Sequence, residues 1–180
     1  MRESTATAGV GSEPDARTAE RARVWSERLK ERIYASLTLL AVLVGLVQGG
    51  NASHRGAAIT VAATALGLWL ATLVADLQAH PVAHGSRPRA ADVRHTLFTS
   101  SPLLTVAATP LLLIALSAVG ALELGTALWI AVGSEVAALA AWGFLGGRRV
   151  GSGPVRALVT AALSAVIGVG VVMVKLLAGH

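Results

Sequence analysis

The chain has 180 residues, of which 54% are hydrophobic and only 14% are charged, and its formal net charge is +5. A soluble domain of this length needs more polar surface, so the composition argues against that class and predicts a membrane protein. The sequence contains no cysteine, which excludes disulfides and thiolate metal sites. The basic residues lie between apolar segments, a pattern that membrane topology explains better than nucleic-acid binding does.

The N-terminal part of the chain is polar. Residues 1–14 are small and polar without periodicity, and we expect a disordered tail there. Residues 15–32 favour a cytoplasmic juxtamembrane helix with an arginine sector beside a thin apolar one. Such a helix can bind anionic lipid headgroups, or it can be a solvated helix that leads into the first span. The arginines of this sector are Arg17, Arg21, Arg28 and Arg32.

Five apolar segments follow, and each is close to the roughly 20 residues that cross a bilayer as a helix. The predicted fold class is therefore all-α, a polytopic membrane bundle of five transmembrane helices placed in the cell membrane as a multi-pass protein. A turn is expected over residues 49–53, and another near Gly120. Pro110 lies inside the third segment, where a proline kinks a helix or is tolerated. The predicted spans are residues 33–50, 57–79, 102–122, 124–145 and 155–178.

Small residues recur at every fourth position in two of these segments, which favours close approach of another helix. The first stripe lies in the second span and the other in the fifth, and contact with a second copy in a homo-oligomer stays open. The members are Ala63, Gly67, Ala71 and Ala75 in the second span, and Ala157, Ala161, Ala165 and Gly168 in the fifth.

The distribution of Lys and Arg predicts the orientation. Thirteen of the fifteen lie before the first span, in the loop after span two, or between span four and Arg156 at the start of span five, whereas Arg55 and Lys175 lie on the opposite side. Because basic residues are enriched in cytoplasmic segments, we expect the N-terminus inside and the C-terminus outside.

The fourth segment, residues 124–145, carries an isolated carboxylate, Glu135, in an otherwise apolar or small run. At about 1.5 Å rise per residue it lies about 15 Å from Leu145, near the membrane centre. Burying a charge at that depth is costly, so Glu135 is expected to be neutral, hydrated or bound to a cation. It is the leading candidate for a transport or cation site, with its neighbour Ser134 as an oxygen donor.

Other polar residues are weaker candidates. Asp76 and Thr72 share a face of the second span near its cytoplasmic end, where we expect Asp76 to be ion-paired with an arginine. Glu123 and Lys175 are expected at the same outer level of neighbouring helices, as a structural ion pair or as two separate side chains. The loop after the second span holds His80, His84 and His95. No regular ligand spacing links these histidines, which favours a solvated basic loop over a metal site and leaves metals and other cofactors unassigned.

The layout resembles the vacuolar iron transporter family. The similarity lies in three stretches: RIYASLTLLAVLVGLVQG, ATALGLWLATLVADLQA and GFLGGRRVGSGPVRALVTAALSAVIGVG. It implies five spans, a cytosolic N-terminus and, for Asp76, the region of the acidic residue that closes the second span. The family's first-span Asp-Gly pair has no counterpart, because that region reads Ala35, Ser36, Leu37.

Two functions remain open from the sequence. One is a cation or proton-coupled transporter that uses Glu135, and the other is a non-transporting anchor or partner subunit that acts through the basic N-terminal segment. An enzyme is not expected, because the histidines lie in loops or at the terminus and Gly133-Ser134-Glu135 lacks the glycine pattern of a nucleophile elbow.

Overall fold

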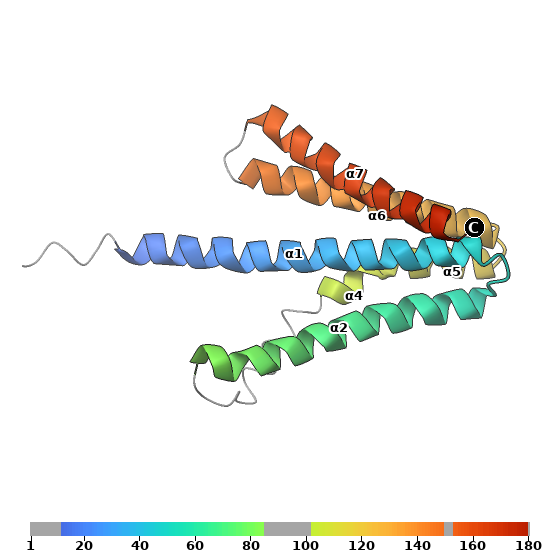
Figure 1. The fold of residues 1–180 in the computed structure, drawn as a ribbon, viewed down its shortest axis with the longest axis horizontal. Helices are drawn as coiled ribbons and strands as arrows, with labels where there is room; N and C mark the ends of the chain where they lie inside the picture. Colours follow the sequence, from blue (N-terminus) through green and yellow to red (C-terminus); the bar gives the residue numbers. More distant parts are fainter. Residues whose placement is uncertain (1–11, 85–101, 150–152, 180) are drawn as a thin grey trace, which may run out of the picture.

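The computed structural model describes residues 12–84, 102–149 and 153–179, and within these ranges the chain is helical, without strands. The long helices run back and forth along one long axis, and α4 and α5 follow each other in the same direction (Figure 1). Their bounds are α1 Ser12–Gln48, α2 His54–His84, α4 Pro102–Val106, α5 Ala108–Ala118, α6 Leu124–Arg149 and α7 Pro154–Ala178.

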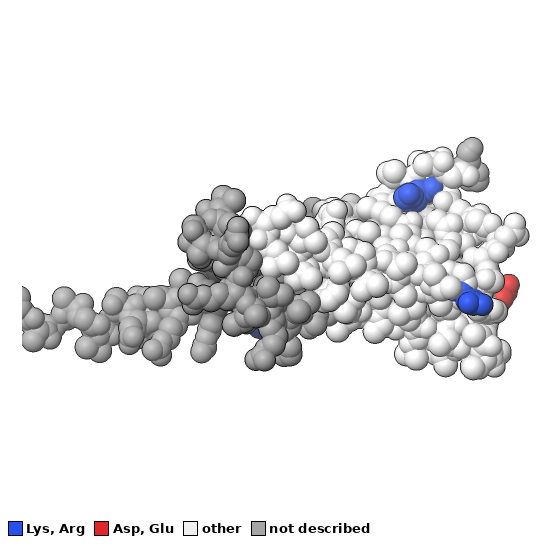
Figure 2. Space-filling model, turned by 90° about the horizontal axis from the view of Figure 1, so that it is seen from below, with Lys and Arg blue, Asp and Glu red and all other residues white. Residues whose placement is uncertain are grey.

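Four of these helices contain a segment that is long and apolar enough to cross a membrane, and a fifth apolar segment is shorter. The four are Val24–Gln48, His54–Ala79, Leu124–Arg149 and Pro154–Ala178, and the shorter one is Leu104–Ala118. Large apolar side chains lie exposed on them, for example Leu163 and Val166 on α7, and one face of the molecule is almost free of charged residues between its ends (Figure 2). Apolar helices with apolar surfaces are what a bilayer requires, so the membrane class is supported.

Helix α1 lies at the centre of the bundle and contacts α2, α4, α6 and α7 (Figure 1). Its most deeply buried apolar side chains recur with a helical period, and they include Leu39, Leu40, Leu43 and Val44, each 1% exposed or less. The predicted juxtamembrane helix and first span therefore form one continuous helix. The helix also includes residues 12–14, which were expected in the disordered tail, whereas residues 1–11 lie outside the described part.

Both predicted turns next to the spans are present. Gly50 has φ of 62°, and the Ser53 hydroxyl accepts a hydrogen bond from the Gly56 backbone N–H at the start of α2 (3.0 Å). Gly120 has φ of 82° directly after α5, and the Ala121 N–H donates to the carbonyl of Leu116 (3.1 Å). A positive φ at glycine lets the chain reverse within a few residues.

The third predicted span is not one helix. It divides into α4 and α5 at Ala107, three residues before the buried Pro110. Proline has no N–H to donate to the carbonyl four residues earlier, that of Val106, and its ring clashes with that carbonyl. The helix therefore ends at Val106 and restarts at Ala108, a break where the sequence allowed a kink.

The two small-residue stripes differ in their surroundings. The α7 stripe packs on α6, where Ala157 is fully buried against Gly147. The α2 stripe is exposed, and Gly67 has no atom near its Cβ position, so no described helix covers it. Helix α2 also continues to His84, beyond residue 79, where the second span was predicted to end. The side chains of His80 and His84, and all of His95, lie outside what the structure describes.

Candidate functional site

The isolated carboxylate of the fourth segment is buried. Glu135 on α6 is 3% exposed, and its Oε2 atom has no hydrogen-bond partner in the described chain. The hydroxyl of Ser36 on α1 is a side-chain hydrogen-bond partner of the carboxyl group. Helix α1 thus supplies one polar contact to Glu135, and the second carboxyl oxygen remains unsatisfied, which is costly inside a protein.

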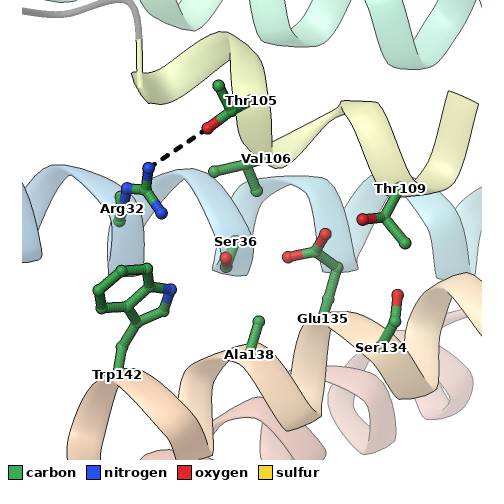
Figure 3. A pocket seen from close by; sticks show the side chains of 9 residues that line it. All are labelled: Arg32, Ser36, Thr105, Val106, Thr109, Ser134, Glu135, Ala138 and Trp142. Atoms are coloured by element: carbon green, nitrogen blue, oxygen red, sulfur yellow. Dashed lines mark hydrogen bonds between the residues drawn. The ribbon is translucent and has the colours of Figure 1, made fainter. Parts of the chain in front are cut away.

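Glu135 faces a polar pocket of about 140 Å³ between α1, α4, α5 and α6 (Figure 3). Six of its nine lining residues carry polar side chains. A space that is both polar and larger than a few water volumes can hold ordered water, so the unsatisfied carboxyl oxygen can be hydrated there. The lining residues are Arg32, Ser36, Thr105, Val106, Thr109, Ser134, Glu135, Ala138 and Trp142.

The predicted oxygen donor Ser134 is part of this pocket. Its hydroxyl donates to the backbone carbonyl of Ala131 (2.8 Å), which commits its proton to the helix. The oxygen lone pairs remain available as acceptors, so Ser134 offers an acceptor to a proton carrier, a water molecule or a cation in the pocket.

The break in the third apolar segment forms one wall of the pocket. Thr105 and Val106 come from the end of α4 and Thr109 from the start of α5 (Figure 3). The two segments place the hydroxyl-bearing side chains of Thr105 and Thr109 beside the pocket.

Arg32 also lines the pocket, and its predicted contact with lipid headgroups stays a prediction. Its guanidinium Cζ lies 4.6 Å from the ring centroid of Trp142, and its Nη2 donates to the Thr105 hydroxyl at 3.4 Å. Arg32 and Ser36 are four residues apart on one face of α1, so the guanidinium lies about one turn from the residue that contacts Glu135. A basic side chain from α1 therefore lines the same pocket as the acid, although residues 124–145 themselves contain no Lys or Arg.

A second hollow adjoins this pocket between α1 and α6. It has a volume of about 170 Å³ and is lined by Trp25, Arg28, Leu29, Arg32 and Trp142. At its edge Arg149 lies over the Trp25 ring, with Cζ 4.6 Å from the centroid. We name this hollow the α1–α6 groove.

Comparisons with protein-family models, with curated proteins and with solved structures found no match to this chain. The resemblance to the vacuolar iron transporter family therefore stays an expectation. Within the described ranges, no three residues among His, Cys, Asp and Glu are grouped as a metal site. The chemistry of the site rests on Glu135 and the pocket alone.

The remaining predicted site residues lie elsewhere. Asp76 is exposed and Thr72 half-buried on α2, and neither lines the pocket. Glu123 and Lys175 are both exposed next to the ends of α6 and α7, and no ion pair between these two described residues is observed, so their pairing stays a prediction. Of the predicted headgroup-binding arginines, Arg28 and Arg32 line the α1–α6 groove, whereas the side chains of Arg17 and Arg21 are outside the described set.

Five polar or aromatic residues of the pocket were not predicted as part of the site, although Arg32 was predicted to bind headgroups. Each lies within or next to an apolar segment. Two pairs, Arg32 with Ser36 and Thr105 with Thr109, are four residues apart, and Trp142 lies seven residues after Glu135. The sequence shows this spacing, but it does not show which faces of different helices are in contact. The five are Arg32, Ser36, Thr105, Thr109 and Trp142.

Proposed function

We propose that this chain is a small integral membrane protein that moves protons or a small cation across the bilayer through the Glu135 pocket. The single observation that carries the proposal is the buried carboxyl group with an unsatisfied oxygen, facing a polar pocket. Ionisable groups inside membrane segments mark ion pathways or proton relays by default, because an apolar residue would be more stable there.

A proton is the favoured cargo. Transition-metal sites use several imidazole, thiolate or carboxylate ligands, and the pocket offers one carboxylate with hydroxyl oxygens. A carboxyl group that gains and loses a proton needs a water path and one acceptor, both of which a hydrated pocket supplies. Iron transport by analogy with the vacuolar iron transporter family remains the second possibility for the cargo.

The membrane arrangement that goes with this function has five spans in the cell membrane, with the N-terminus in the cytoplasm and the C-terminus outside. The charge bias of Lys and Arg supports it, together with the opposite directions of α1 and α2 and of α6 and α7 (Figure 1). In this arrangement α4 and α5 cross together as one broken span, and the broken region lies at the depth of the pocket.

The alternative, an anchor or partner subunit that acts through its basic N-terminal segment, has less support. Arg32 stacks on Trp142, and Trp25 on the same segment stacks under Arg149. Cation–π contacts of this kind join the basic segment to α6. A segment packed in this way is a part of the bundle and offers less free surface to a partner.

Reconstituted vesicles test the proposal. The purified chain is placed in liposomes with a trapped pH-sensitive dye, and a proton gradient is imposed. We expect dissipation of the gradient to depend on the protein and to fall to the protein-free rate in Glu135→Gln, which keeps the shape but cannot titrate. Asp76→Asn is the matched control, because it removes an acid that does not line the pocket. Unchanged proton flux in Glu135→Gln would refute the proposal for protons. A parallel assay of ferrous iron uptake into the same vesicles, with the same variants, tests iron as the cargo.

A further inference from the structure

The Glu135 pocket and the α1–α6 groove share two lining residues, Arg32 and Trp142. These two side chains therefore stand between the hollows. In Figure 3 they lie together at one end of the Glu135 pocket, whereas Thr109 and Ser134 lie at its other end. The groove lies on the side of α1 that leads to the N-terminal, arginine-rich part of the chain.

The contact between the two dividing residues is adjustable. The guanidinium is held by one cation–π contact and by one hydrogen bond near the upper limit of length. Arginine side chains are long and have several rotatable bonds, so a shift of Arg32 needs no backbone movement. In contrast, the floor of the groove is packed: a Cβ at Gly146 would lie 3.3 Å from Leu29 Cδ2 and 3.9 Å from the Trp25 ring.

The positive charge of Arg32 affects which ions can pass between the two hollows. The described groove lining holds Arg28 and Arg32 and no acidic residue. A cation that enters from this side meets positive charge before it reaches Glu135, whereas water does not. A guanidinium in the passage therefore hinders cations and leaves a water path for protons, as fixed arginines do in other selective pores.

We propose that the α1–α6 groove is the cytoplasmic entrance to the Glu135 pocket and that Arg32 and Trp142 form its gate. Displacement of the guanidinium from the Trp142 ring joins the two hollows, and its return closes the passage to ions. The assignment to a transport path rests on the proposed function, but the entrance and the gate themselves can be measured without any transport.

The absence of cysteine makes this measurement direct. Ala138 lines the Glu135 pocket on the same face of α6 as Trp142 and Glu135, so Ala138→Cys places one thiol behind the gate. Ala137→Cys is the matched control, because that neighbouring position is exposed on the outside of the bundle, where lipid excludes a charged reagent. The probe is a membrane-impermeant methanethiosulfonate with a trimethylammonium group, added to either side of oriented vesicles.

We expect slow labelling of the Ala138→Cys thiol from the cytoplasmic side when the rest of the chain is unchanged. Arg32→Gln keeps a polar side chain and Trp142→Leu keeps an apolar one. Combined with Ala138→Cys, each should raise the labelling rate at least tenfold. Combined with Ala137→Cys, each should leave the thiol unlabelled. Trp129→Leu, at an exposed tryptophan of α6 away from the pocket, should change nothing. Size-exclusion profiles identify folded variants, and either gate variant suffices if the other does not fold.

Two outcomes would overturn the gate. One is an unchanged cytoplasmic rate in the folded gate variants, and the other is an increase only for reagent added from outside. Failure of the proposed function is separate, because it concerns proton flux in Glu135→Gln and does not depend on the labelling rate.

Discussion

Gly147 on α6 lies directly against Ala157 on α7: a Cβ atom at Gly147 would stand 2.7 Å from the Ala157 Cα and 2.5 Å from the Thr160 hydroxyl oxygen. Because the Ala157 Cα belongs to the backbone of α7, a side chain at Gly147 fits only if α6 and α7 move apart. We therefore expect Gly147→Ala to lower the free energy of unfolding by about 1–3 kcal/mol, the usual cost of overpacking. Thermal unfolding in detergent micelles measures the change.

Gly133→Ala is the control for this prediction. Gly133 lies on the same helix, and nothing lies within 4 Å of its Cβ position. Alanine is the better helix former, so this variant should be as stable as the parent or slightly more stable. Equal effects of the two substitutions would show that the close contact between α6 and α7 does not exist in the protein.

Pro110 is expected to maintain the break between α4 and α5. Pro110→Ala restores an N–H that can donate to the Val106 carbonyl, so the two short helices should join into one. Hydrogen exchange at residues 105–111 should slow by at least tenfold. Pro102→Ala, at the first residue of α4 where no such bond is missing, should leave this exchange unchanged. Fast exchange in both variants would mean that another interaction causes the break.

The positions of four helices follow from apolar length alone. The predicted spans 57–79, 124–145 and 155–178 each lie inside an observed helix, and glycines were correctly assigned to the intervening turns. Helix α1 continues without interruption through residue 33, the predicted start of the first span. Charge changes at residue 33, but strong helix formers continue on both sides, and a membrane boundary does not end a helix.

The site was only half predictable. Glu135 stands out because it is an acid without a neighbouring base in its own segment. Arg32 was assigned to lipid headgroups from its place in the arginine sector of the N-terminal helix, and the sequence did not show that its long side chain also reaches Trp142. Asp76 and Thr72 were grouped with Glu135 by chemistry, but they lie on α2, outside the pocket lining. Helical periodicity places residues on one face and gives no information on which helix that face meets.

The orientation of the bundle is a third testable expectation. Gln48 at the end of α1 donates to the Leu176 carbonyl on α7 (3.2 Å), and His54 at the start of α2 is 3.0 Å from the Ser117 hydroxyl on α5. These two contacts hold together the end of the bundle that carries few Lys and Arg residues. A reporter fused after His180 should therefore be active only outside the cytoplasm, and one inserted after Arg149 only inside. Cytoplasmic activity of the C-terminal fusion would contradict the five-span arrangement.

Charge reversal at Glu135 tests whether its surroundings are closed. Glu135→Lys leaves a second cation in a pocket whose lining already includes Arg32, without an acidic partner among the lining residues. An uncompensated buried charge costs about 3–5 kcal/mol, whereas Glu135→Gln introduces no charge and should change stability by about 1 kcal/mol or less. Glu123→Lys makes the same reversal at an exposed position and should shift stability by about 0.5 kcal/mol or less. Thermal unfolding of the three purified variants in one detergent gives the comparison. If Glu135→Lys is as stable as Glu123→Lys, the carboxyl group has free access to water and the pocket is not enclosed by the helices described above.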